Sequence, residues 1–183
     1  MRILSTLLIT LLLVGACTSS KKTASETVET VQETAEEIIE VQTTASTDKS
    51  AEQIQWELDQ PKILAYVEAN NIDAQWLNSG LYYVILDEGK GKMVDESSEV
   101  EVNYSLSQLD GSFMWSTYKM NAPETYNMNN VIRAWKEGIP LIKEGGKIQL
   151  IVPSSLAYGA EGLEDNVPPN TNLVFDLELV KVN

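Results

Sequence analysis

The distribution of aromatic residues limits where this chain can build a core. All 13 of them (4 Trp, 7 Tyr and 2 Phe) lie from Trp56 onward. Residues 18–55 consist largely of Thr, Ser, Ala, Glu and Gln, and they contain no Gly or Pro. Such a segment cannot bury enough apolar surface to offset the entropy lost on ordering. The sequence therefore predicts a flexible acidic tether over residues 17–55, followed by one globular domain.

A second interpretation of the tether remains open. Four apolar residues follow one another at spacings of 3, 4 and 3, namely Val28, Val31, Ala35 and Ile38. This spacing is typical of a short coiled-coil seam. Two heptads are too few for a stable helix without a partner, so the tether is the favoured interpretation.

Composition excludes several classes of function. The formal net charge is −14, which repels nucleic acid, so we expect no nucleic-acid partner. The chain has no histidine and one cysteine, Cys17. Histidine-dependent catalysis, histidine-ligated metals and an intrachain disulfide are therefore excluded. The remaining chemical groups are carboxylates, hydroxyls, aromatic rings and the backbone, and we expect neither a metal nor a cofactor.

The first residues are typical of an export signal. Arg2 precedes residues 3–14, which are apolar apart from one Ser and two Thr residues. This run is shorter than the roughly 20 residues that a membrane-spanning helix needs. It ends in LVGAC at 13–17, which resembles the lipobox of bacterial lipoproteins. The resemblance implies that residues 1–16 are a signal peptide and that lipid is attached to Cys17. The alternative is an ordinary secretory signal in which Cys17 is incidental.

From Trp56 the hydrophobic pattern predicts a short helical lead-in over residues 56–79 and then strands. Leu58, Ile63, Leu64 and Val67 form a loose helical stripe, and Pro61 is compatible only with the first turn. Residues 81–86 and 100–106 have strand patterns, and Asp110-Gly111 is a hairpin turn. One short helix is predicted around residues 133–137, with further strands at 147–152 and 173–182. The fold class is therefore α+β, an antiparallel sheet with one helix on its face.

Residues 80–183 also resemble a known family. The matching segments are, in order, VEVNY at 100–104, DG at 110–111, VIRAWKEG at 131–138, GGK at 145–147, IVP at 151–153, LAYGA at 156–160, VPPN at 167–170 and LVFDLEL at 173–179. Together they resemble the FKBP-type peptidyl-prolyl cis-trans isomerases. The resemblance implies an FKBP-like half-barrel of antiparallel strands wrapped around the short helix, with an apolar pocket between them.

The resemblance also implies a set of site residues. Trp135 is expected as the pocket floor, Tyr158 as a hydroxyl donor to a substrate carbonyl, and the backbone N–H of Ile132 as a second donor. The expected substrate-binding residues are Tyr104, Met114, Trp115, Val131, Leu163, Val167 and Phe175. The expected substrates are X-Pro segments of exported proteins, whose peptide bonds isomerise in an apolar pocket without acid, base or metal.

Four residues depart from the family pattern. The family usually has Phe-Asp after the hairpin turn, where this chain has Met114 and Trp115. A wall phenylalanine is expected near Pro123, and the chain has Glu124 there. Leu163 occupies a position where many members carry His or another loop residue.

These departures leave two alternatives to a folding enzyme: a binding module with little activity, or an accessory lipoprotein of an envelope complex. The expected location is the bacterial cell envelope, with the protein lipid-anchored at Cys17. Thr18 rather than Asp follows Cys17, which favours the periplasmic face of the outer membrane.

Overall fold

The computed structural model describes residues 49–120 and 122–183. The predicted signal peptide, Cys17 and the part of the predicted tether before residue 49 lie outside the described residues. Within those two ranges, no helix has both the length and the apolar character needed to cross a membrane.

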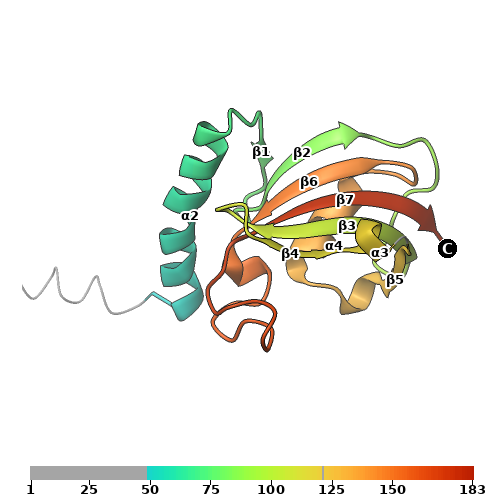
Figure 1. Cartoon of the computed structure of the whole chain (residues 1–183). Coiled ribbons are helices and arrows are strands. Elements are labelled where there is room, and N and C mark those ends of the chain that lie inside the picture. The colour runs from blue at the N-terminus through green and yellow to red at the C-terminus, as the bar shows by residue number, and fades with distance from the viewer. Residues whose placement is uncertain (1–48, 121) are drawn as a thin grey trace, which may run out of the picture. The chain divides into compact units, whose positions relative to one another are not determined.

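The described part of the chain forms a seven-stranded antiparallel sheet (Figure 1). Its strands are β1 (Gln75–Trp76), β2 (Tyr82–Asp87), β3 (Glu99–Gln108), β4 (Phe113–Ser116), β5 (Glu124–Asn127), β6 (Lys147–Val152) and β7 (Leu173–Val182). Their order is β1-β2-β6-β7-β3-β4, and β5 pairs with the first half of β3. This arrangement confirms the predicted α+β fold class.

The two ten-residue strands β3 and β7 form the centre of this sheet. Their register runs from Val100 opposite Val182 to Gln108 opposite Leu173. In β3, Val100, Val102 and Leu106 are buried, and Tyr104 on the same face is half-buried. This period of two is the one that the sequence shows, because successive side chains of a strand point to opposite faces.

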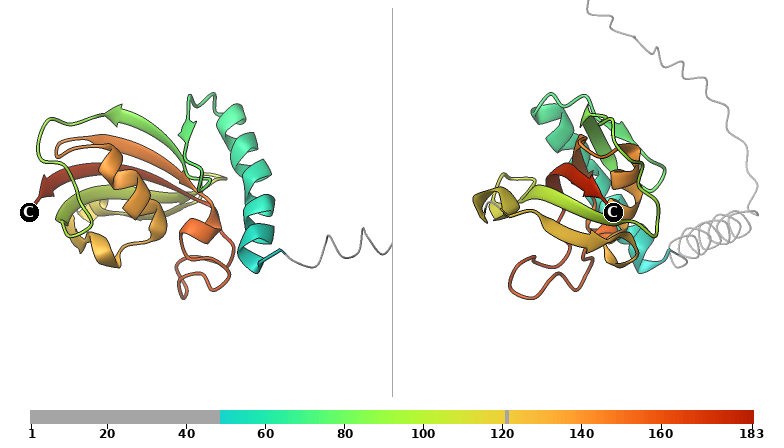
Figure 2. Two further views of the ribbon diagram at one scale, coloured as in Figure 1. Left: turned by 180° about the vertical axis from the view of Figure 1, so that it is seen from behind. Right: turned by 90° about the vertical axis from the view of Figure 1, so that its right-hand side faces the viewer.

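The helix α4 (Arg133–Gly138) covers one face of the sheet (Figure 2). It buries Ala134 and Trp135, and the 3₁₀ helix η2 (Ile139–Leu141) continues from it. At Gly138, a Cβ atom would lie only 2.7 Å from the side chain of Leu150 on β6. Glycine at this position therefore allows α4 to approach the sheet closely. The remaining short helices are α3 (Thr117–Met120), η1 (Met128–Asn130) and η3 (Ser154–Leu156).

The first described helix, α2 (Ala51–Ala69), begins five residues before the predicted start at Trp56. Ser50 caps it: its hydroxyl accepts a hydrogen bond from the Gln53 N–H, and the Gln53 side chain accepts one from the Ser50 N–H. This capping box satisfies two N–H groups of the helix end. Pro61 consequently lies in the interior of the helix rather than in its first turn, which corrects the prediction.

The predicted apolar stripe on this helix is also only partly buried. Ile63 is fully buried and packs with Tyr82, Ile151 and Val174 in a second, smaller hydrophobic cluster. In contrast, Leu58 and Leu64 are about half exposed, with relative exposures of 55% and 45%.

A buried carboxylate fastens α2 to the rest of the fold. Asp59 is fully buried, and its Oδ2 accepts hydrogen bonds from the backbone N–H (3.0 Å) and the hydroxyl (2.6 Å) of Ser154. Its Oδ1 accepts a hydrogen bond from Gln55 at 2.8 Å, and the Lys62 ammonium lies 4.0 Å away. Burying a carboxylate is costly unless hydrogen bonds compensate for the lost water. Asp59 therefore holds α2 in a fixed position against η3.

We expect Asp59→Ala to destabilise the protein by about 2–3 kcal/mol, because it removes several buried hydrogen bonds to a charged group. Urea unfolding of the full chain measures this difference. Asp73→Ala is the matched control, since Asp73 is exposed, and it should change the free energy of unfolding by about 0.5 kcal/mol or less. Equal effects of the two substitutions would contradict a stabilising role for the buried carboxylate.

Candidate active site

A cavity of about 240 Å³ lies among strands β3, β5 and β7, helix α4 and the loop that follows η3. Its lining is mainly aromatic and aliphatic. The lining residues are Tyr104, Leu106, Tyr126, Asn130, Val131, Ile132, Trp135, Tyr158, Leu163 and Phe175.

The indole of Trp135 is the centre of this lining. The rings of Tyr104 and Tyr126 each lie 5.2 Å from it, at an interplanar angle of 83°. The Phe175 ring lies 5.6 Å away at 77°. Edge-to-face contacts of this kind are the favoured geometry for aromatic pairs. Three rings standing edge-on around one indole make a rigid apolar bowl.

The polar side of the bowl is a small hydrogen-bond network. The Tyr104 and Tyr126 hydroxyl oxygens lie 3.2 Å apart. Both hydroxyls donate to Oε2 of Glu124, at 3.4 Å from Tyr104 and at a short distance from Tyr126. Burial, together with the hydrogen bond to Glu124, raises the pKa of Tyr126 above its ordinary value. Glu124 therefore fixes the orientation of two of the three rings.

Two donors in the cavity wall have no hydrogen-bond partner among the described residues. One is the hydroxyl of Tyr158, whose pKa is raised by burial, so that it is a neutral donor at physiological pH. The other is the backbone N–H of Ile132, the residue that precedes the first turn of α4. Both groups are available to a carbonyl oxygen of a bound ligand.

A third unpartnered donor is the indole N–H of Trp135. Trp135 is 4% exposed, and its Nε1 atom has no hydrogen-bond partner in the described part of the chain. A buried donor left unpaired costs free energy, and such groups are uncommon outside functional sites.

The structure brings together seven of the ten expected site residues. Tyr104, Val131, Ile132, Trp135, Tyr158, Leu163 and Phe175 all line the cavity. The other three, Met114, Trp115 and Val167, do not.

Each of these three side chains lies outside the cavity wall, in a different part of the fold. Trp115 lies on the edge strand β4 and is 42% exposed. Met114 packs, half-buried, against the main core. Val167 is buried beneath the loop, where it exchanges two backbone hydrogen bonds with Leu163. Val167 therefore supports a lining residue and is not one itself.

Sequence reasoning missed three lining residues: Leu106, Asn130 and Tyr126. Tyr126 is the most important of them, because its ring forms an aromatic wall where the family pattern predicts a phenylalanine near Pro123. In β5, Glu124 pairs with Val102 and Tyr126 pairs with Val100. Side chains alternate along a strand, so Glu124 and Tyr126 share one face of β5. This alternation is the sequence pattern from which Tyr126 could be predicted as a lining residue.

Comparisons with known proteins agree with this architecture. A family model for the FKBP-type peptidyl-prolyl cis-trans isomerases matches residues 90–180. The FKBP-type isomerase FkpA of Escherichia coli K12 is 41% identical over 105 residues, which are 57% of this chain and 38% of that protein. A probable FKBP-type isomerase of Haemophilus influenzae is 36% identical over 115 residues, 63% of this chain and 48% of that protein. The chain thus spans less than half the length of these curated relatives.

Solved structures extend the likeness to the fold. The crystal structure of Escherichia coli FkpA matches with a TM-score of 0.63 and 30% identity, covering 88% of this chain and 74% of that one. A peptidyl-prolyl isomerase from Pseudomonas syringae matches with a TM-score of 0.61 and 27% identity, covering 74% of this chain and 98% of that one. A half-barrel sheet around an indole-floored cavity is the fold of a peptidyl-prolyl isomerase domain. This chain belongs to the FKBP-type peptidyl-prolyl cis-trans isomerase family.

The burial of these tyrosine hydroxyls predicts that the free energy of unfolding falls at alkaline pH. Burial raises the pKa of Tyr104, Tyr126 and Tyr158 in the folded state, whereas unfolded phenols titrate near pH 10. Above about pH 10 the folded state therefore binds more protons than the unfolded state, and the free energy of unfolding falls as pH rises. Below that pH these three groups contribute no pH dependence.

Urea unfolding between pH 8 and pH 11 measures this slope. Tyr126→Phe should make the fall shallower, whereas Met93→Leu, at an exposed site outside the cavity, should leave it unchanged. Identical slopes for all three proteins would be evidence against the burial of the cavity phenols.

Proposed function

We propose that this protein catalyses cis-trans isomerisation of X-Pro peptide bonds in other polypeptides. The observation that carries the proposal is the Trp135 floor with three edge-on rings, which makes an apolar bowl of about 240 Å³ with free donors at its wall. The flat face of a prolyl ring packs well on an indole, and among the described residues no charged side chain lines the bowl. The family membership supports the same activity.

The bowl lowers the barrier by changing the solvent around the bond. Rotation about an amide costs roughly 18–20 kcal/mol, because the planar form is stabilised by resonance. The twisted transition state has lost this resonance and is less polar than the planar amide. Moving the bond from water into an apolar cavity therefore destabilises the ground state more than the transition state.

The two free donors supply orientation. The Tyr158 hydroxyl and the Ile132 N–H hold carbonyl oxygens on the two sides of the rotating bond, while the prolyl ring stays on Trp135. Tyr158 remains protonated throughout, because its pKa is raised and no proton is transferred. The reaction breaks no covalent bond, so this mechanism requires neither an acid–base pair nor a cofactor.

Isomerisation of a short X-Pro peptide by the full chain tests the activity. Trp135→Ala should reduce kcat/KM by at least tenfold, since it removes the floor of the bowl. Tyr158→Phe keeps the ring and removes one hydrogen bond, and should reduce kcat/KM by about 3- to 10-fold. Phe113→Leu, at an exposed site on β4, is the control and should leave the rate unchanged. Wild-type protein that does not accelerate the reaction would refute the proposal.

We further propose that the protein acts in the bacterial cell envelope as a folding helper for exported proteins. The support comes from the sequence, in which a short apolar run ends at the only cysteine in an LVGAC segment. On this proposal lipid on Cys17 anchors the protein at the periplasmic face of the outer membrane, and the acidic segment after it serves as a tether.

Replacement of the single cysteine tests the anchor. Cys17→Ser should move the protein from the membrane fraction to the soluble fraction of lysed cells, because the acyl chains would be absent. Thr18→Ser is the matched control and should leave the protein with the membranes. Cys17→Ser protein that still needs detergent for extraction would contradict lipid anchoring.

A further inference from the structure

A second cavity adjoins the prolyl bowl. It has a volume of about 500 Å³ and shares Tyr158 with the bowl as a wall. One side of it is the loop 157–161, and the other side is the first turns of α2, through Ala51, Glu52 and Gln55. Below, this cavity is called the α2 channel.

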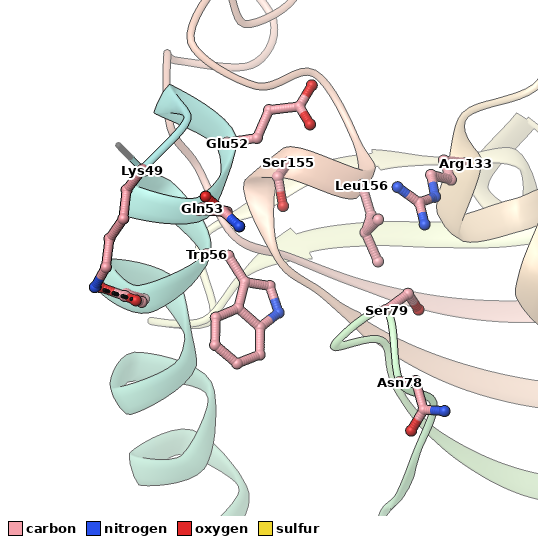
Figure 3. A pocket seen from close by; sticks show the side chains of 10 residues that line it. Lys49, Glu52, Gln53, Trp56, Asn78, Ser79, Arg133, Ser155 and Leu156 are labelled. Carbon is pink, nitrogen blue, oxygen red and sulfur yellow. Dashed lines mark hydrogen bonds and ion pairs between the residues drawn. The ribbon is translucent and has the colours of Figure 1, made fainter. Parts of the chain in front are cut away.

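The α2 channel leads on to a third cavity. This outer cavity has a volume of about 460 Å³ and shares Glu52 and Ser155 with the channel. Figure 3 shows Trp56 of α2 on one side of it, with Ser79 and Arg133 on the other. The prolyl bowl, the α2 channel and the outer cavity are therefore neighbours, each sharing at least one lining residue with the next, and this series is called the path below.

The helical wall of this path is fixed. Asp59 joins α2 to Ser154, four residues before Tyr158, through two hydrogen bonds. Asp59 also accepts a hydrogen bond from Gln55, which lines the channel. The same buried carboxylate therefore holds the channel wall and the segment that leads to Tyr158. A rigid groove orders less on binding, and so it binds a chain at lower entropic cost.

The channel has an acidic lining. Glu52 and Glu161 are both exposed and line it, and no Lys or Arg of residues 49–120 or 122–183 does. The outer cavity differs, because its two cations are paired: Lys49 lies 2.7 Å from Glu57, and Arg133 lies 2.8 Å from Glu137. Glu52 lines both cavities, and Glu161 adds a second carboxylate in the α2 channel beside the bowl.

We propose that the α2 channel is a binding subsite for the polypeptide that flanks the proline, and that it prefers a cationic side chain there. This inference rests on the proposed isomerase function, since it says where the substrate polypeptide lies beyond the proline that the bowl holds. A chain whose carbonyl is held by Tyr158 must pass Tyr158, and the channel begins at that residue. The α2 wall from residue 51 to residue 55 is about 6 Å long, the length of about two extended residues. Lys or Arg within about three residues of the proline is therefore the recognised feature.

The test uses the full chain and a set of short X-Pro peptides that carry Lys, Ala or Glu two or three residues from the proline, on either side. For the wild type we expect kcat/KM to be about 3- to 10-fold higher for a Lys peptide than for the corresponding Glu peptide at low salt. The preference should shrink in 0.5 M NaCl, because the carboxylates are exposed and screened. The double variant Glu52→Gln/Glu161→Gln should lower the ratio to about 1–2.

The control Glu68→Gln/Glu96→Gln removes the same charge at two exposed sites outside all three cavities, and it should keep the wild-type ratio. A Lys preference that survives in Glu52→Gln/Glu161→Gln would overturn the subsite. Fluorescence anisotropy of the same labelled peptides separates this inference from the activity. Binding that prefers Lys and depends on the two carboxylates, without isomerisation, supports the subsite and refutes the proposed enzyme. Absence of any Lys preference in both rate and binding refutes the subsite alone.

Discussion

The packing of one indole connects the fold of this domain to its site. The three rings that contact Trp135 edge-on come from β3, β5 and β7, and both β5 and β7 pair with β3. The helix that carries the indole comes close to β6 because Gly138 leaves room for Leu150. The cavity is therefore formed by the same contacts that make the core. A site built this way is preorganised and needs no closure over the substrate to take shape.

The second constraint is the buried carboxylate of Asp59. It makes α2 part of the compact unit Lys49–Asn183, although the family pattern begins only at about residue 80. Without this helix the α2 channel would lose the side formed by Ala51, Glu52 and Gln55. The lead-in helix thus shapes the surroundings of the bowl, whereas its amphipathic pattern alone indicates only that one side is buried.

Much of the fold and the site follows from local sequence patterns. Alternation in β3 and the Asp110-Gly111 turn predict the sheet, and the motif around Trp135 predicts the floor of the bowl. Tyr126 was missed because the connection before β5 has no fixed length in sequence, so the wall position fell on Glu124. The helix start was missed because Ser50 and Gln53 lie in a polar segment whose capping geometry gives no hydrophobic signal. The position of Tyr126 depends on the pairing of β5 with β3, whereas the capping box is a local signal that hydrophobic periodicity does not register.

The structure explains how this domain differs from the family pattern after the hairpin turn. Trp115 stands where the family usually has a carboxylate, and it lies largely exposed on the edge strand β4. Glu124 on β5 does not line the bowl, but its carboxylate accepts hydrogen bonds from Tyr104 and Tyr126, which do. Tyr104 and Tyr126 both line the bowl, and the carboxylate of Glu124 on β5 is the acceptor that orients them. The absence of a carboxylate at residue 115 therefore leaves the polar wall of the bowl hydrogen-bonded through Glu124.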